Sequence, residues 1–332
     1  MSKNSPGNFF EDFRVGQVIR HATPRTLTTG DAALYTGLFG PRFAVQSSDA
    51  FAKAIGYPRS PLDDLLVFHV VFGKTVPDVS LNAVANLGYA NCFFRKPVYP
   101  GDTLAAQSEV IGLKENSSRK TGIVYVRTTG YNQDSAPVLE YVRWVMVRKR
   151  AEAAPAPGDH VPRLPTELDP KLLGEACPPI HVAAYDFALA GSADRFSDYE
   201  VGERIDHVDG LTVEEAEHQI ATRLYQNTAR IHFNQFIGQG AVRATADLRR
   251  ACHFAGAGAV AKRARQCVPR RRDQRWPPRC AVVCRRYGFR LVGSAGQSGI
   301  AGPRRCRRAA AADDRNTRPT VRGFSAQNRR GL

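Results

Sequence analysis

Residues 63–73 spell DDLLVFHVVFG, two aspartates followed by a run that is apolar on every side of a helix. A helix of this kind is expected to be buried inside a domain, because none of its faces suits water. Two shorter helices are expected before it, in TTGDAALYTGLFG (residues 28–40) and SSDAFAKAIG (residues 47–56). Each begins with threonine or serine, which suit a helix N-cap, and closes on a glycine. The stretch therefore predicts a central helix around which the rest of the domain is built.

Three strand-like runs follow the apolar stretch. They are DTLAAQSEVIGL (residues 102–113), TGIVYVRTTGYN (residues 121–132) and VLEYVRWVMVRK (residues 138–149). Their alternation and β-branched content favour an antiparallel sheet with one covered face. A sheet wrapped around one apolar helix is an α+β architecture. The Pro- and Ala-rich segment 151–165, AEAAPAPGDHVPRLP, is typical of a linker.

An internal repeat follows the linker. FEDFRVGQVIRH, from Phe10, returns as FSDYEVGERIDH, from Phe196, at an offset of 196 − 10 = 186 residues. The repeat indicates a duplicated domain. We expect a first domain at 8–150, a linker and connecting segment at 151–192, and the start of a second domain at 193–240.

The segment FRKPVYPGDTL, residues 94–104, follows the helices and carries a PGDT element. This order of segments resembles the hot-dog fold of the MaoC-like (R)-specific enoyl-CoA hydratases, and two copies resemble the double-hot-dog members. The order through both halves is similar to that of mesaconyl-CoA hydratases. The resemblance covers about residues 8–240. It implies a carbon–oxygen lyase that reversibly hydrates mesaconyl-CoA (2-methylfumaryl-CoA) to β-methylmalyl-CoA, or another (R)-specific enoyl-CoA hydratase.

The net charge of +16 hides a sharp change in composition near residue 240. Residues 241–332 hold 22 Arg, one Lys, four Asp and no Glu, so 23 − 4 = +19, whereas residues 1–240 carry 24 − 27 = −3. Five of the seven cysteines also lie after residue 240. High charge with few large apolar residues predicts disorder. The second copy should instead contain its own buried helix and PGDT strand here, and it contains neither.

A lost reading frame explains this basic segment. Codons can be chosen for residues 241–332 so that the +1 frame yields GDTVFAWSEV, which mirrors GDTLAAQSEV at residues 101–110. We therefore interpret residues 241–332 as an out-of-frame, disordered basic tail, and we expect the chain as translated to be defective. The alternative is a native basic tail on a non-catalytic protein that binds acyl-CoA or nucleic acid, the latter without sequence specificity.

The resemblance also implies candidate catalytic residues. MaoC-like hydratases are similar in carrying a G-D-x-N-P-[IVL]-H motif, and QNTARIH, residues 226–232, occupies that position in the second copy. His232 takes the place of the histidine, which can move a proton near neutral pH. Asn227 stands where the family has Asp, and its amide can orient water or a carbonyl but cannot transfer a proton. The first copy holds Pro41 and Gln46 in these slots and would shape the acyl part of the cleft.

Substrate binding and partners follow from the same resemblance. Mesaconyl-CoA carries a free carboxylate, for which Arg230 and Arg42 are candidate partners, with Gln46 beside the acyl group. His21 and His207 recur in both copies and are expected to serve the fold. We expect no metal and no cofactor beyond the CoA of the substrate, no specific nucleic acid and no membrane contact. A cytoplasmic protein is expected, in which the chain either suffices alone or forms a homodimer.

The frame hypothesis makes a prediction about the gene. Sequencing across codons 235–295 is expected to show one extra base near codon 240, whose removal restores a second copy with its own buried helix and GDT turn. Independent clones with an intact frame through this region would reject the hypothesis.

Overall fold

The computed structural model describes residues 5–165, 178–191, 194–204, 214–232 and 234. Its centre is the expected buried helix, α4 (Asp64–Thr75). Asp63 caps it, because its side chain accepts the N–H of Leu65 at 2.8 Å. Every residue from Leu66 to Val71 is buried. The helix extends two residues past Gly73 and runs directly into a π-helical turn, Val76–Ser80.

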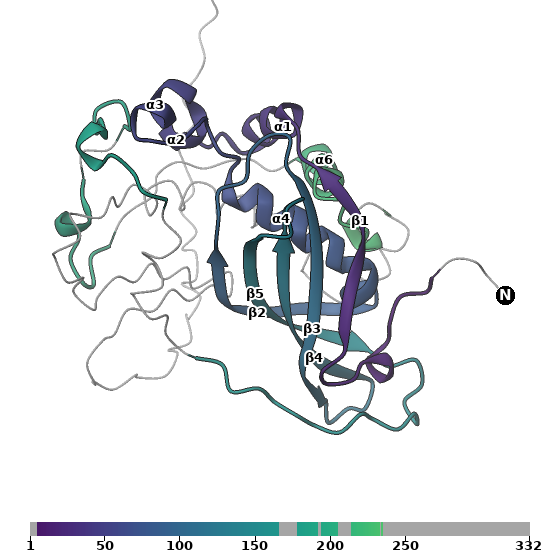
Figure 1. Ribbon diagram of the computed structural model, residues 1–332. Helices are drawn as coiled ribbons and strands as arrows, with labels where there is room; N and C mark the ends of the chain where they lie inside the picture. The colour runs from purple at the N-terminus through teal and green to yellow at the C-terminus, as the bar shows by residue number, and fades with distance from the viewer. Residues whose placement is uncertain (1–4, 166–177, 192–193, 205–213, 233, 235–332) are drawn as a thin grey trace, which may run out of the picture. The chain divides into compact units, whose positions relative to one another are not determined.

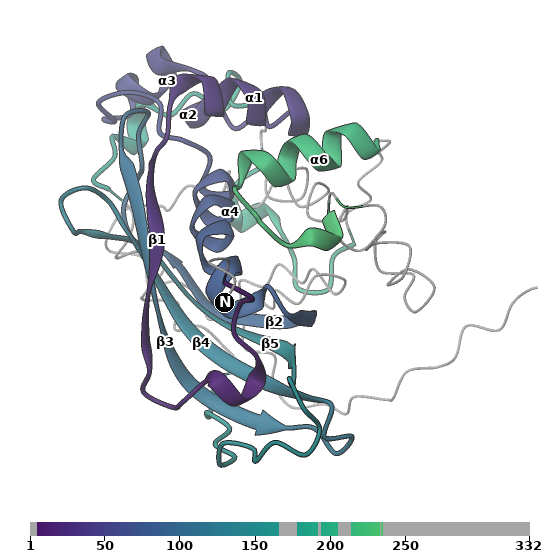
Figure 2. The same cartoon turned by 90° about the vertical axis from the view of Figure 1, so that its right-hand side faces the viewer.

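Five antiparallel strands in the order β1-β3-β4-β5-β2 form one sheet, and α4 lies across one face of it (Figures 1 and 2). The expected α+β hot-dog arrangement is thus confirmed. Apolar side chains of α4 share one core with residues of the sheet such as Leu104, Leu139 and Tyr141. The strands are β1 (Val18–Thr26), β2 (Ala83–Phe94), β3 (Thr103–Glu115), β4 (Thr121–Tyr131) and β5 (Pro137–Arg148).

Strand β2 is one element that the sequence pattern did not predict. Its sequence, AVANLGYANCFF, contains glycine and two asparagines, which are depleted in strands. Its pairing with β5 shifts register at three places, and Asn91 has a positive φ of 49°. Each irregularity interrupts the two-residue alternation by which a strand is detected in a sequence.

The helices before α4 follow their expected caps. Helix α1 (Thr29–Phe39) begins after Thr28, whose side chain forms a capping box with Asp31, and ends at Gly40 in the left-handed conformation. Helix α3 (Asp49–Ala54) begins after Ser48, which accepts the N–H of Phe51. A further short helix, α2 (Ala44–Ser47), precedes it and was not expected.

The two copies repeat each other's backbone at the offset of 186. The turn η1 (Phe10–Asp12) returns as η4 (Phe196–Asp198), and α1 returns as α6 (Glu215–Leu224). The capping box of Thr28 and Asp31 returns as Glu214 and Glu217. Gly40 and Gln226 both adopt the left-handed conformation, with φ of 54° and 53°. The same local structure therefore forms twice, even where the side chains differ.

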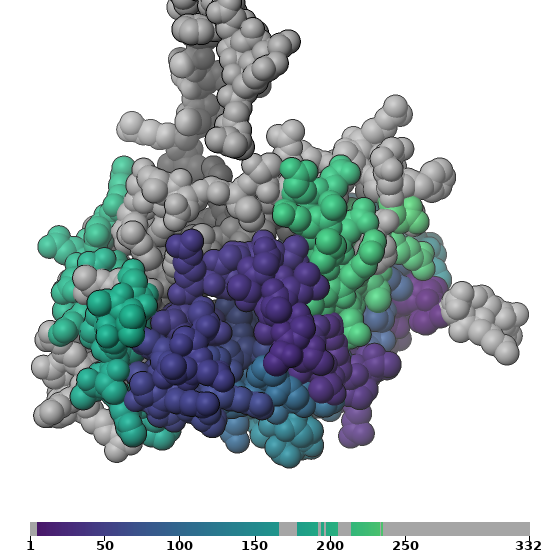
Figure 3. All heavy atoms as spheres, turned by 90° about the horizontal axis from the view of Figure 1, so that it is seen from above, coloured from purple at the N-terminus to yellow at the C-terminus, as the bar shows by residue number. Residues whose placement is uncertain are grey.

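The second copy packs on the first through α6. Helix α6 contacts α1, and the two lie side by side in Figures 2 and 3. Leu224 is buried in the core around α4. Arg25 of β1 donates a hydrogen bond to the carbonyl of Leu224 and is paired with Asp31. The end of α6 is thus anchored to both a strand and a helix of the first copy.

Tyr225 continues this contact onto α4. Its ring stacks on His69 at a centroid distance of 4.3 Å and lies 6.4 Å from Phe39. Its main chain passes so close to Gly73 that a Cβ there would lie 1.8 Å from the Tyr225 carbonyl oxygen. Gly73 is therefore the residue that lets the second copy reach the central helix, because any side chain would block the approach.

The expected linker runs along the sheet. Leu113 and His160 exchange two backbone hydrogen bonds of 2.8 and 2.7 Å, and Glu115 donates its N–H to Asp159 at 2.9 Å. In the parts of the chain that the structure describes, no helix combines the length and apolarity needed to cross a bilayer. The proposed out-of-frame segment 241–332 lies outside the described residues, as do parts of 151–192 and 193–240.

The close approach at Gly73 predicts the effect of a single methyl group. Gly73→Ala is expected to lower the free energy of unfolding by about 1–3 kcal/mol, because the blocking atom belongs to the main chain and cannot rotate away. Urea unfolding measures the loss, and proteolysis at 214–232 reports whether the segment has been displaced.

Gly37→Ala is the matched control. Gly37 lies inside α1, and a Cβ there meets nothing within 4 Å. This variant is expected to gain up to about 1 kcal/mol from helix propensity alone. Equal gains in both variants would show that Tyr225 does not approach Gly73 in solution.

The buried imidazole of His69 predicts acid sensitivity. Burial lowers the pKa of His69 to about 3, against 6.5 for an exposed histidine. Between these values the unfolded chain binds the proton and the folded chain does not, so stability falls as the pH falls below about 6.5. The expected slope reaches about 1.4 kcal/mol per pH unit. Urea unfolding from pH 7 to 5 measures it, and His69→Gln should flatten the curve. An unchanged slope would contradict the assignment.

Candidate active site

The chain turns sharply after α6 and places the predicted catalytic residues on that turn. Gln226 has the left-handed conformation, and Asn227 donates its N–H to the carbonyl of Thr222 at 3.1 Å. The side-chain oxygen of Asn227 then accepts the N–H of Ala229 at 3.0 Å. This bond starts the short helical turn η5 (Arg230–His232). The side-chain oxygen of Asn227 therefore shapes the turn, and within the described part of the chain no acceptor is recorded for its side-chain amide N–H groups.

His232 lies at the end of that turn. Its ring is 5.2 Å from the ring of His218, at an interplanar angle of 55°. Its Nδ1 is buried and has no hydrogen-bond partner among the described residues. Burial, and then the neighbouring His218, lower the pKa of His232 to about 4. The imidazole is consequently neutral near pH 7 and able to accept a proton.

The other predicted residues fall into two groups. Arg230 is exposed on the same turn as His232. Gln46 lies in α2, where its amide donates to the carbonyl of Leu62 at 3.5 Å, and Arg42 is exposed just before that helix. In Figure 1, helix α1 lies between α2 and α6. The structure thus brings Asn227, Arg230 and His232 onto one turn, and Arg42 and Gln46 onto the equivalent turn of the first copy.

His218 and Tyr225 are the neighbours of this turn that the motif did not reveal. His218 lies in α6, and its ring contacts that of His232. Tyr225 follows the end of α6, and its ring stacks on His69 of α4. The repeat contains a signal for His218, because the first copy has Ala32 at the equivalent position. The repeat pairs Tyr225 with another aromatic residue, Phe39, but it gives no sign of the contact with α4, which exists only after the second copy docks.

Among the described residues, no three His, Cys, Asp or Glu side chains converge into a group that could hold a metal. Burial raises the pKa of the Cys92 thiol to about 12, which keeps it protonated and unreactive. Cys177 lies outside the described residues.

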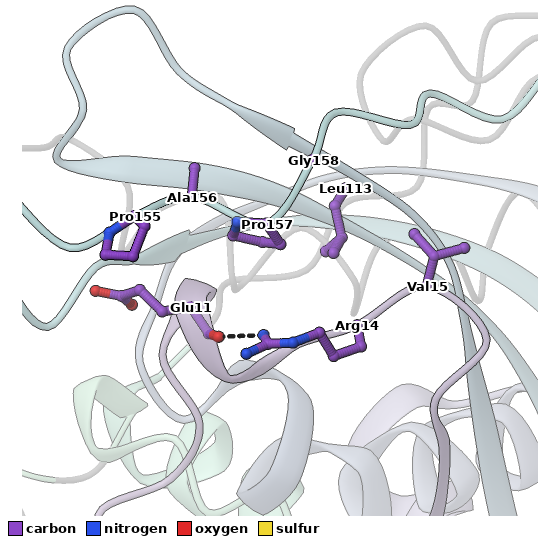
Figure 4. A pocket seen from close by; sticks show the side chains of 8 residues that line it. All are labelled: Glu11, Arg14, Val15, Leu113, Pro155, Ala156, Pro157 and Gly158. Carbon is purple, nitrogen blue, oxygen red and sulfur yellow. Dashed lines mark hydrogen bonds between the residues drawn. The ribbon is translucent and has the colours of Figure 1, made fainter.

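A surface hollow of about 520 Å³ lies elsewhere, between the N-terminal turn and the linker (Figure 4). The guanidinium of Arg14 donates to the carbonyls of Glu11 and Phe13, and the Glu11 carboxylate accepts the N–H of Arg150 and Ala151. The charged side chains that line the hollow, Arg14 and Glu11, are therefore already hydrogen-bonded to the main chain. It contains none of the predicted site residues, so we assign the site to the turn after α6.

Comparison with known proteins identifies the family of the chain. The family model described as mesaconyl-CoA hydratase matches residues 2–236. The chain is 62% identical over 235 residues to beta-methylmalyl-CoA dehydratase of Chloroflexus aurantiacus, covering 70% of this chain and 66% of that protein. It is 58% identical over 234 residues to mesaconyl-CoA hydratase of Cereibacter sphaeroides, covering 70% and 67%. The match thus spans about two thirds of the length of these relatives.

A solved structure gives the same result. The crystal structure of a putative MaoC domain protein dehydratase from Chloroflexus aurantiacus superimposes with a TM-score of 0.70 at 55% identity. The superposition covers 78% of this chain and 76% of that one. Since the family model matches well over half of the residues, the chain belongs to the mesaconyl-CoA hydratase family.

Proposed function

We propose that this protein is a carbon–oxygen lyase that reversibly adds water to mesaconyl-CoA, giving β-methylmalyl-CoA. The observation that supports the proposal is a half-buried imidazole, His232, whose pKa burial lowers and which lies where the predicted motif has its histidine. The two curated relatives are named for the two directions of one reaction. A reversible hydration accounts for both names.

The residues of the turn suit this chemistry. Hydration of an enoyl thioester requires a base for the water that attacks Cβ and an acid for the proton delivered to Cα. His232 takes the proton from water in its neutral form and can return it as imidazolium. Asn227 contributes its amide N–H groups, which orient the water or the substrate carbonyl. With asparagine at this position, His232 is the titratable group of the motif.

Substrate binding is proposed for three further side chains. The free carboxylate of mesaconyl-CoA needs a cation, and Arg230 lies exposed on the same turn as His232. Arg42 and Gln46 lie on the equivalent turn of the first copy, where we place the contacts to the rest of the acyl-CoA. Acid–base addition of water requires no redox group, so the CoA of the substrate is the one coenzyme in the proposal.

The proposal also requires the rest of the second copy. The family match ends at residue 236, close to the composition change near residue 240. By the repeat, the second copy's central helix and its strands would follow this point. We infer that full activity needs the reading frame restored after residue 240, since transition-state stabilisation of the thioester oxygen depends on donors from that half.

An activity assay tests the function. The frame-restored protein is expected to consume mesaconyl-CoA, followed by the loss of enoyl-thioester absorbance, and to prefer it to crotonyl-CoA. His232→Ala is expected to lower kcat/KM by about 10²–10⁴, because it removes the proton-transfer group.

His181→Ala is the matched control. His181 is exposed and makes its hydrogen bonds through the main chain, so its loss should leave kcat/KM unchanged. Absence of turnover with both substrates, or full activity of His232→Ala, would reject the proposed function.

A further inference from the structure

The second copy contains a pair of imidazoles that the first copy lacks. His218 of α6 and His232 of η5 have ring centroids 5.2 Å apart, and α6 contacts η5. At the offset of 186 the first copy has Ala32 and Gln46 instead. The supporting backbone is equivalent in the two copies, because α1 matches α6 and α2 overlaps η5. The pair is therefore a property of the second copy's side chains and not of the shared fold.

We propose that His218 is a positioning residue for His232, holding the His232 imidazole in the uncharged form that accepts a proton from water. This inference rests on the proposed function, and it assigns a role to a residue outside the family motif. His218 need not touch the substrate, because it acts through the ring that does.

The physical basis is repulsion between two like charges in a shielded site. A proton on either imidazole raises the free energy of protonating the other, so the pair resists becoming doubly charged. Burial is the larger cause that lowers the pKa of His232, and His218 is the second cause. Burial also lowers the pKa of His218 itself. Below the pKa of His218, a proton on that ring opposes the protonation of His232, so His232 stays neutral to a lower pH than burial alone would allow.

The other charged side chains near the turn do not offset this effect. Glu217 of α6 accepts the N–H of Glu214 in the capping box, and Arg223 donates to Gln219. Arg230 is exposed to solvent. Within the described residues, His218 is the ionisable group whose charge acts on His232. A carboxylate beside His232 would have favoured the charged form instead.

Two substitutions of His218, one that removes its charge and one that makes it more strongly positive, test the proposal in the full-length chain. Nuclear magnetic resonance of ¹³C-labelled histidine follows each imidazole through a pH titration, and His232→Gln identifies the His232 signal among eight histidines. His218→Gln removes the second charge, so the pKa of His232 should shift upward. His218→Lys introduces a stronger positive charge, so the pKa should shift downward. A residue that only fills space would not give shifts of opposite sign.

His181→Gln is the control, because it removes an exposed imidazole from another part of the chain. It should leave the titration of His232 unchanged. Far-UV circular dichroism verifies that each variant retains its helices. Shifts of the same sign in both His218 variants, or no shift in either, would overturn the inference.

The titration requires no turnover, so it separates this inference from the proposed function. In the frame-restored enzyme, the acid limb of the kcat/KM profile should move with the His232 pKa, upward for His218→Gln and downward for His218→Lys. Titration shifts without any hydratase activity would reject the function alone. If the enzyme is active but the pH dependence of kcat/KM is the same in both His218 variants as in the unmodified protein, the role of His218 alone is rejected.

Discussion

The contact between the main chain of Tyr225 and Gly73 is the constraint on which the candidate site depends. Helix α4 is buried on nearly every side, and the remaining approach is open only because residue 73 has no side chain. Through this approach the second copy reaches the core of the first, where Leu224 is buried and Tyr225 stacks on His69. The turn that carries His232 begins directly after this anchor. Its position is thus fixed by packing inside the first domain.

The described segments of the second copy have the same local backbone as their equivalents in the first, whereas their side chains differ. The equivalent helices, capping boxes and left-handed residues occur at a constant offset. The first copy places Pro41 and Gln46 where the second has Asn227 and His232. The second copy also has His218 where the first has Ala32. In the proposed function, the first copy serves the architecture and the second carries the reactive group.

The net charge of the whole chain does not represent the part that the family model matches. The excess of positive charge lies after residue 240, where the family match has already ended. The preceding residues are slightly acidic and contain the fold, the repeat and the candidate site. For a chain whose composition changes abruptly, charge is informative only segment by segment, because binding depends on local fields and not on a sum.

The sequence by itself determined the central helix, the three regular strands, the helix caps and the duplication. Each of these rests on local periodicity or on a repeated pattern, and both can be recognised in the sequence without the tertiary structure. The motif QNTARIH also marked the turn with Asn227 and His232. Strand β2 was not predicted because its bulges break the alternation of apolar and polar residues, and α2 was not predicted because it is a single turn. Only the tertiary structure decided the anchoring of Tyr225 on α4 and the pairing of His218 with His232. These depend on how the two copies pack, and burial and the distance between charges exist only once that packing has formed.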